Sequence, residues 1–220
     1  MQAEGRIVRR RYRNRVTAGR ELGTLLADEC PSACDPDLVV LGLPRGGVPV
    51  AAAAAARLDA PVDILVVRKL GVPGHEELAM GAIASGGSVV LNDGFIQRLG
   101  VSDEALSAVV ARESKELERR ETSYRRGRPN LDVGGMAVIV VDDGIATGAS
   151  MKVALEAVRQ LEPRVLHAAS PVASVEATRE LSEYADGVFI VTTPEPFYAV
   201  GYWYDDFAQT TDDEVIEILS

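Results

Sequence analysis

The chain has 220 residues, of which 47% are hydrophobic and 25% charged, so it can bury a full core. Its formal net charge of −10 disfavours a polyanion as its main partner. No apolar run reaches the length of a membrane span, and the N-terminal arginines precede no apolar stretch. We therefore expect one domain over residues 1–220, in the cytoplasm and without a membrane partner. The chain has only two histidines to accompany Cys30 and Cys34, too few for a zinc site, so free thiols are expected, with a local disulfide as the alternative.

The two ends of the chain carry opposite charges. Residues 5–20 hold seven arginines and no acid, whereas residues 195–220 hold seven acids and no base, so the ends could attract each other. The arginine run could be an arm that binds nucleic acid, or a solvated tail that leads into a helix from Val16 to Asp28. The acidic remainder of the chain would repel a polyanion, which favours the tail.

A first strand is expected from Leu38 to Leu43, followed by a glycine turn and an alanine-rich helix that ends at Leu58. In the turn, Gly46 and Gly47 allow a tight bend with exposed N–H groups, and Arg45 offers paired donors for a dianion. The signal is weak by itself, because a glycine pair after a strand often forms an ordinary turn.

A second strand is expected from Val62 to Val67, and the polar segment 68–77 that follows is interrupted by glycine and proline. Arg68 and Lys69 at its start could belong to a mobile loop that carries charge to a ligand, or to a solvated surface loop. Next come a short hairpin about Gly86 and Gly87 and a long, charged surface helix from Ser102 to about Tyr124. This helix could also form a subunit contact, so a homodimer is one expected state.

The stretch from Ala137 to Ser150 joins a strand, a pair of carboxylates and a loop of small residues. Ala137 to Val141 is a β-branched run typical of a parallel strand buried on both faces, and Asp142 and Asp143 stand at its carboxyl end. The carboxyl ends of parallel strands are where α/β proteins bind ligands. A helix is expected to begin near Ser150, which places the loop at a helix N-terminus.

This loop suits a phosphate monoester. Small residues let backbone N–H groups approach an anion, the helix start adds free donors and a favourable dipole, and Thr147 and Ser150 add hydroxyls. Asp142 and Asp143 would repel a bare phosphate, but they suit the vicinal hydroxyls of a sugar or a Mg²⁺ ion. Together the two parts describe a site for ribose 5-phosphate.

The segment from Val140 to Ser150, VVDDGIATGAS, resembles the PRPP-binding signature of type I phosphoribosyltransferases along its whole length. The resemblance implies a doubly wound, mainly parallel α/β sheet flanked by helices. It also implies Mg²⁺-dependent transfer of the 5-phosphoribosyl group from 5-phosphoribosyl-1-pyrophosphate (PRPP) to a nitrogenous acceptor, with release of pyrophosphate. In that family the acidic pair contacts the ribose hydroxyls, and the loop holds the 5-phosphate; the matching loop residues here are Gly144, Ala146, Thr147, Gly148, Ala149 and Ser150.

Other parts of the PRPP site are implied more loosely by the same resemblance. The turn after the first strand would bind pyrophosphate through Arg45, Gly46 and Gly47, and a loop after the second strand would cover PRPP with Arg68 and Lys69. The catalytic candidates are then Asp142, Asp143 and Lys69. Metal binding would involve Asp142 and Asp143, either directly or through PRPP and water.

The rest of the chain completes the expected domain. Strands are expected at 165–169 and 187–192 with a helix at 175–184 between them, so the core covers about 16–192 and residues 193–220 form a small hood. Residues 193–207 hold six of the eleven aromatic residues. These rings either pack as core or form a wall for a flat acceptor; the candidates for the wall are Phe197, Tyr198, Trp203 and Tyr204.

One departure from the family bears on the acceptor. Enzymes that salvage 6-oxopurines usually carry an aspartate at the position of Ala146, so a hypoxanthine or guanine acceptor is disfavoured here. The alternative function is a regulatory PRPP sensor of the same fold without transfer activity, which could bind nucleic acid through the arginine-rich N-terminus.

Overall fold

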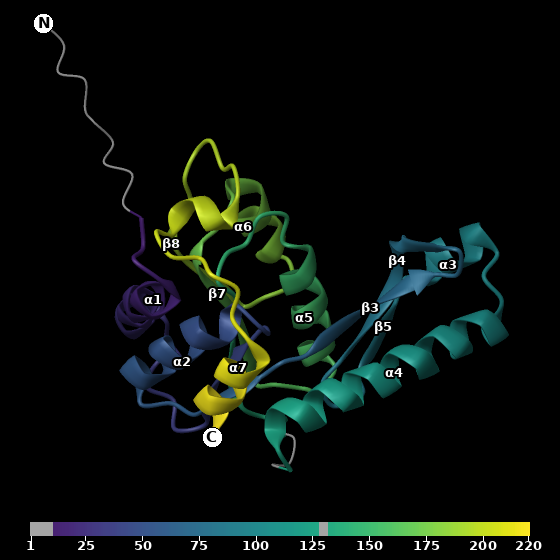
Figure 1. The fold of residues 1–220 in the computed structure, drawn as a ribbon, viewed down its shortest axis with the longest axis horizontal. Helices are drawn as coiled ribbons and strands as arrows, with labels where there is room; N and C mark the ends of the chain where they lie inside the picture. The colour runs from purple at the N-terminus through teal and green to yellow at the C-terminus, as the bar shows by residue number, and fades with distance from the viewer. Residues whose placement is uncertain (1–10, 128–131) are drawn as a thin grey trace, which may run out of the picture.

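The computed structural model describes residues 11–127 and 132–220. The core is a five-stranded sheet with the order β2-β1-β6-β7-β8, and every neighbouring pair in it is parallel (Figure 1). The expected doubly wound α/β fold is confirmed. The strands of this sheet are β1 (Leu38–Gly42), β2 (Val62–Ile64), β6 (Ala137–Val141), β7 (Val165–Val172) and β8 (Gly187–Thr192).

Helices cover both faces of this sheet because its strands are apolar on both sides. Val138 and Val140 of β6 face the helices α5 (Ala149–Arg159) and α6 (Val175–Leu181). Ile139 faces the opposite layer, formed by α1 (Arg15–Glu29) and α2 (Gly47–Leu58). Successive side chains of a strand point to opposite faces, so an uninterrupted apolar run requires a helix layer on each.

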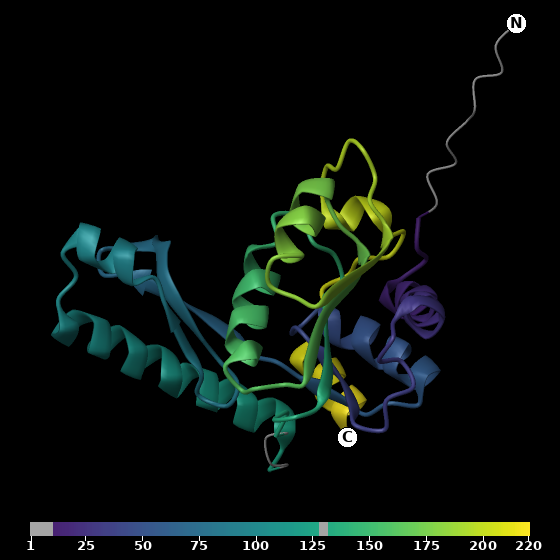
Figure 2. The same ribbon diagram turned by 180° about the vertical axis from the view of Figure 1, so that it is seen from behind.

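An arm projects from this core and runs away from it in both ribbon views (Figures 1 and 2). It consists of a separate antiparallel sheet of order β3-β4-β5 and the two helices that follow it. The elements of the arm are β3 (Val67–Val72), β4 (His75–Ala84), β5 (Val89–Leu91), α3 (Asp93–Leu99) and α4 (Asp103–Arg125).

The arm corrects one expectation about residues 62–77. The second core strand ends at Ile64, and Val67–Val72 pairs with β4 instead of forming an irregular loop. The reason is packing: Leu70 of β3 and Met80 of β4 are buried in one cluster with Leu117 of α4. The hairpin about Gly86 and Gly87 and the long charged helix α4 are as expected.

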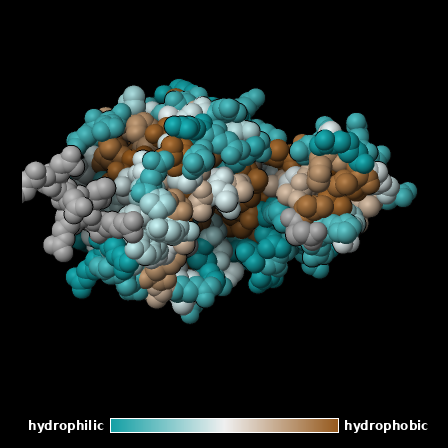
Figure 3. Space-filling view, turned by 90° about the horizontal axis from the view of Figure 1, so that it is seen from above, coloured by the Kyte–Doolittle hydropathy of each residue, from teal (hydrophilic) through white to brown (hydrophobic). Residues whose placement is uncertain are grey.

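The free end of the arm exposes apolar surface. Leu78, Leu91 and Leu99 are 41%, 37% and 44% exposed. Figure 3 shows hydrophobic residues gathered on this part of the molecule.

The terminal segments meet each other, as their charges suggested, but backbone hydrogen bonds join them. The N–H of Tyr12 donates to the carbonyl of Trp203 at 2.8 Å, and the N–H of Asp205 donates to the carbonyl of Tyr12 at 2.8 Å. Beyond η1 (Val200–Trp203) the chain ends in α7 (Asp212–Leu219), which contacts α2 and α4. Arg6, Arg9 and Arg10 lie outside the described residues, so the nucleic-acid arm stays a prediction.

Among the helices of the described ranges, none combines the length and the apolar composition that crossing a membrane would require.

Candidate active site

The glycine turn and the acidic pair lie side by side because they follow neighbouring strands. Gly42 at the end of β1 is in register with Val141 at the end of β6. A Cβ atom on Gly46 would collide with Oδ2 of Asp143, and one on Gly47 would lie 2.6 Å from the carbonyl oxygen of Val141. A side chain at Gly46 would displace the carboxylate of Asp143, and one at Gly47 would displace the backbone of Val141. The two glycines therefore let the turn and the acidic pair come into contact.

The acidic pair is held by short hydrogen bonds. The N–H of Asp143 donates to Oδ1 of Asp142 at 2.8 Å, and Nε of Arg15 donates to Oδ2 of Asp143 at 2.7 Å. The side chains of Arg15 and Asp143 are only 12% and 14% exposed. Sequence reasoning missed Arg15, which it counted only as part of a charged tail. Asn14 caps α1 by accepting from the N–H of Thr17, and this start of the helix places Arg15 beside the site.

Burial disfavours the state in which Asp142 and Asp143 are both ionised. Burial, with the neighbouring charge of Asp143, raises the pKa of Asp142 to about 8. Burial also raises the pKa of Asp143, although Arg15 opposes this shift. Such a pair is stabilised by hydroxyl donors or by a cation, which is the chemistry expected of a sugar site with Mg²⁺.

The loop after the acidic pair is exposed to solvent and is held in place by a hydrogen bond. Ala146, Thr147, Ala149 and Ser150 are exposed, and Gly148 starts α5 with a φ of 76°. The Ser174 hydroxyl donates to the carbonyl of Ala146 at 2.7 Å, which ties the loop to the start of α6. The start of α5 thus lies among exposed residues beside a loop held by this hydrogen bond, an arrangement that suits an anion.

A cavity of about 350 Å³ lies next to this loop and brings together four of the candidate residues, Lys69, Asp142, Ala149 and Ser150. Its polar wall is formed by Asp142, Ser150, Lys69 and Arg120. Lys69 was expected here, but Arg120 of α4 was not. The sequence signal for Arg120 was only its place on a charged helix, because nothing in the pattern showed that α4 returns to the core.

Two other expected cations form ion pairs elsewhere. Nη2 of Arg68 lies 2.6 Å from Oε2 of Glu113, a residue of α4 whose side chain is 9% exposed. Arg68 therefore binds the arm together and does not line the 350 Å³ cavity. Nη1 of Arg45 lies 3.6 Å from Oδ1 of Asp212 in α7, at a second cavity of about 430 Å³.

The aromatic tail divides into buried and exposed rings. Trp203 and Tyr204 are 5% and 3% exposed and pack with Tyr12 and Val172, which supports the core interpretation for these two. The Tyr204 hydroxyl donates to the carbonyl of Asp143 at 2.5 Å, so the tail supports the acidic pair. Tyr198 is 65% exposed.

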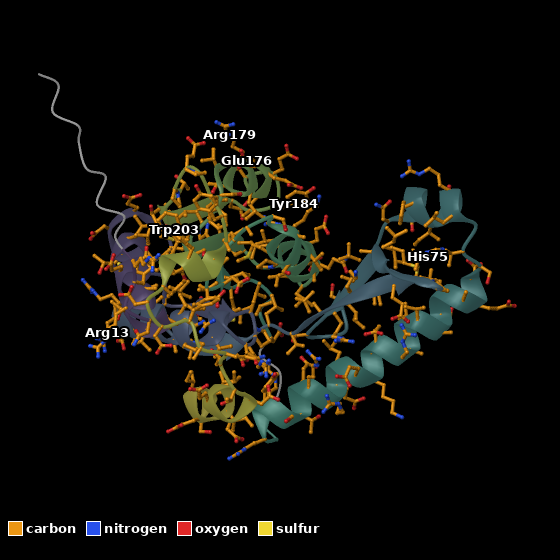
Figure 4. The ribbon with its side chains drawn as sticks, turned by 45° about the horizontal axis from the view of Figure 1, so that its top comes forward. Arg13, His75, Glu176, Arg179, Tyr184 and Trp203 are labelled. Carbon is orange, nitrogen blue, oxygen red and sulfur yellow. The ribbon has the colours of Figure 1, made fainter. Side chains whose placement is uncertain are left out.

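The tail and the outer part of the arm lie on different sides of the molecule. In Figure 4 the arm carries His75 away from Trp203 in the tail. The cavity that contains Asp142 is lined by Lys69 and Arg120 at the base of the arm, and the tail meets the acidic pair through the hydrogen bond from Tyr204.

A magnesium site can be tested against the donors that are present. Within residues 11–127 and 132–220, no group of three or more histidine, cysteine, aspartate and glutamate side chains could hold a metal. Asp142 and Asp143 provide the hard oxygen ligands that Mg²⁺ prefers, but they would need further oxygens from a bound phosphate ester and water. The residues thus fit an ion that arrives with its ligand.

A doubly wound sheet with an acidic pair and a loop of small residues at its carboxyl edge defines a class of α/β proteins that bind their ligands at this edge. Residues 19–205 match the family model of the phosphoribosyl transferase domain, so the chain belongs to this family.

Relatives and solved structures agree with this assignment. Two Mycobacterium tuberculosis proteins (strains CDC 1551 / Oshkosh and H37Rv), named as candidate phosphoribosyl transferases, are 44% identical over 208 residues. The match covers 94% of this chain and 46% of each relative, so the chain spans about half the length of these curated relatives. The crystal structure of TT1426 from Thermus thermophilus is similar with a TM-score of 0.83 and 43% identity, covering 95% of this chain and 97% of that one. AQ2163 from Aquifex aeolicus, at 13% identity, a TM-score of 0.50 and coverage of 94% and 86%, shares the fold.

Proposed function

We propose that this protein transfers the 5-phosphoribosyl group from PRPP to a nitrogenous acceptor, a nucleobase or a related heterocycle, and releases pyrophosphate. The observation that carries the proposal is the cavity of about 350 Å³ in which Asp142, the end of the loop at Ala149 and Ser150, and Lys69 meet. In the reaction the bond between C1 and the pyrophosphate oxygen breaks, and its electron pair leaves with pyrophosphate. The acceptor nitrogen supplies the pair for the new bond to C1, and its proton passes to solvent.

Positioning and electrostatics are the proposed sources of catalysis. Asp142 and Asp143 accept hydrogen bonds from the ribose hydroxyls, and the N–H groups and hydroxyls of residues 144–150 bind the 5-phosphate. C1 develops positive charge as pyrophosphate leaves, so the carboxylates stabilise the sugar while Lys69, with Arg45 and the N–H of Gly46, stabilises the leaving group. The N–H of Gly47 donates to the carbonyl of Leu43 at 2.9 Å, so Gly47 serves only to let the turn approach the acidic pair. Mg²⁺, when bound, would neutralise part of the pyrophosphate charge. No covalent nucleophile is required.

The acceptor would lie on the tail side of the sugar. The exposed ring of Tyr198 and the partly exposed ring of Phe197 can stack on a flat heterocycle. Trp203 and Tyr204 would act from behind, through their packing and the hydrogen bond to Asp143. We also propose that the protein works in the cytoplasm, in nucleotide metabolism, and as a homodimer, which size-exclusion chromatography with light scattering would test.

Pyrophosphate release with PRPP, Mg²⁺ and a panel of nucleobases tests the transfer directly. PRPP with Mg²⁺ should also raise the melting temperature, because a ligand that binds only the folded state stabilises it by mass action. The double substitution Asp142→Asn with Asp143→Asn should remove most of this increase. An unchanged response in the double variant would refute the sugar-site assignment.

A PRPP sensor without transfer activity is favoured by one observation. Arg45 and Arg68, two cations expected at the leaving group, lie in ion pairs with Asp212 and Glu113. A sensor would show the increase in melting temperature with PRPP and no pyrophosphate release with any acceptor. A nucleic-acid shift assay with the full chain would then test regulation.

A further inference from the structure

The long helix of the arm returns to the core at the point where two cavities meet. The cavity of about 350 Å³ contains Asp142, Ser150 and Lys69. The cavity of about 430 Å³ lies between the glycine turn, α4 and α7. Pro44 and Arg120 line both. Arg120 is therefore the cation at the junction, on the path that an extended ligand would take from the sugar site past the glycine turn.

The charges around this junction suit a polyanion. Arg45, Arg119 and Arg120 line the larger cavity against a single acidic lining residue, Asp212. The carboxylate of Asp212 is already engaged, because the Tyr124 hydroxyl donates to it at 2.7 Å and Arg45 lies 3.6 Å from it. On the other side of the junction Lys69 adds a fourth cation.

Arg120 can leave its present partner with little loss. Its Nε donates to Oε1 of Glu116 at 2.9 Å, and its side chain is 42% exposed, a geometry in which ion pairs contribute little to stability. Glu116 would keep Arg119, which donates to both of its oxygens at 2.8 and 2.9 Å. A bound anion could thus take over Arg120 without leaving a carboxylate unpaired.

We propose that Arg120 is a ligand of the pyrophosphate group of PRPP, and that it exchanges Glu116 for this group when PRPP binds. The proposal rests on the proposed function and deepens it. The contact with pyrophosphate would then come from helix α4. The family resemblance had implied that a loop with Arg68 and Lys69 covers PRPP. Glu116 then sets the affinity for pyrophosphate, since it competes for the same guanidinium.

Calorimetric titration of the full chain with inorganic pyrophosphate and Mg²⁺ tests this contact without any transfer reaction. Arg120→Ala should weaken binding roughly 10- to 100-fold, as expected for the loss of charge-assisted hydrogen bonds. The control is Lys115→Ala, which removes an exposed cation of the same helix that lines neither of these two cavities; its affinity should stay within about twofold of the wild type. Glu116→Gln should tighten binding, because it releases Arg120. Melting temperatures of all variants check that they fold.

The outcomes separate this inference from the proposed function. Equal losses in Arg120→Ala and Lys115→Ala, or no pyrophosphate binding by the wild type, would overturn the role of Arg120. If the wild type shows transfer activity and Arg120→Ala binds pyrophosphate as tightly as the wild type, the role of Arg120 is refuted and the proposed function is unaffected. If pyrophosphate binding requires Arg120 but no acceptor yields transfer, the proposed transferase function is refuted and the contact between Arg120 and pyrophosphate is supported.

Discussion

Arg15 and Asp143 are 128 positions apart in the chain, yet Nε of Arg15 donates to Oδ2 of Asp143 at 2.7 Å. The same guanidinium donates through Nη1 to the carbonyl of Ala208 at 2.7 Å and lies 4.0 Å from the centre of the Phe207 ring. One carboxylate of the proposed sugar site is therefore held by the N-terminal helix, which is itself held by the C-terminal tail. The ends of the chain belong to the site and do not merely cover it.

We expect Arg15→Ala to lower the free energy of unfolding by about 1–3 kcal/mol, because a largely buried carboxylate loses its charged partner. PRPP affinity should fall as well, since Asp143 is then free to move away from the sugar. Arg15→Lys should recover part of both losses. Thermal denaturation and PRPP titration measure the two effects, and Arg20→Ala, an exposed change on the same helix, is the control. Full PRPP affinity in Arg15→Ala would contradict the role given to Asp143.

The raised pKa of Asp142 predicts how stability depends on pH. The pKa is about 8 in the folded protein against a usual value of 3.8, so ionisation favours the unfolded chain. The stability associated with the protonated carboxyl is fully present below about pH 4 and is lost as pH rises through 8.

Asp142→Asn cannot ionise, so at pH 8 its free energy of unfolding should exceed that of the wild type by about 2 kcal/mol. The coupling to Asp143 makes this difference smaller than the pKa shift of an isolated carboxyl would give. The difference should vanish near pH 4. Melting temperatures across this range measure it, with Asp28→Asn on the exposed surface of α1 as control. A gain that does not change with pH would show that burial does not hold Asp142 protonated.

Arg68 and Lys69 are neighbours on β3 with different tasks, because successive side chains of a strand point to opposite faces. Arg68→Ala should lower stability by about 1–3 kcal/mol, since Glu113 loses its partner in a nearly buried setting. Lys69→Ala should leave stability almost unchanged and lower turnover more than PRPP affinity, as expected if it stabilises the leaving group. Parallel kinetics and denaturation separate the pair, and a purely thermal effect of Lys69→Ala would remove it from the site.

The aromatic tail should respond according to burial. Tyr204→Phe removes the hydrogen bond to the carbonyl of Asp143 and should lower stability by about 1 kcal/mol. Tyr198→Leu should leave stability unchanged and make the binding free energy of the acceptor less favourable by about 0.5–1.5 kcal/mol, the contribution of ring stacking. Acceptor titration in the presence of PRPP, followed by the fluorescence of Trp203, measures the second effect. Equal acceptor affinity for Tyr198→Leu and wild type would place the acceptor elsewhere.

Local sequence determined the parts of the site that are continuous in the chain. The strand from Ala137 to Val141, the acidic pair and the loop to Ser150 could be predicted because each follows from neighbours: apolar residues, then carboxylates, then small residues before a helix. The contact between this motif and the Gly46–Gly47 turn depended on the tertiary structure, because β1 and β6 lie far apart in the chain and become neighbours only in the sheet.

Only the tertiary structure decided which distant side chains complete the site. Arg15 and Arg120 both lie in charged segments where the sequence offers several equivalent arginines, and only packing selects one of them. Residues 68–72 were predicted to lie in a loop because glycine and proline interrupt the segment 68–77. It forms a strand because β4 and α4, which follow later in the chain, bury its apolar face. Burial, which long-range contacts create, also decided that Trp203 and Tyr204 are core and that the pKa of Asp142 is raised.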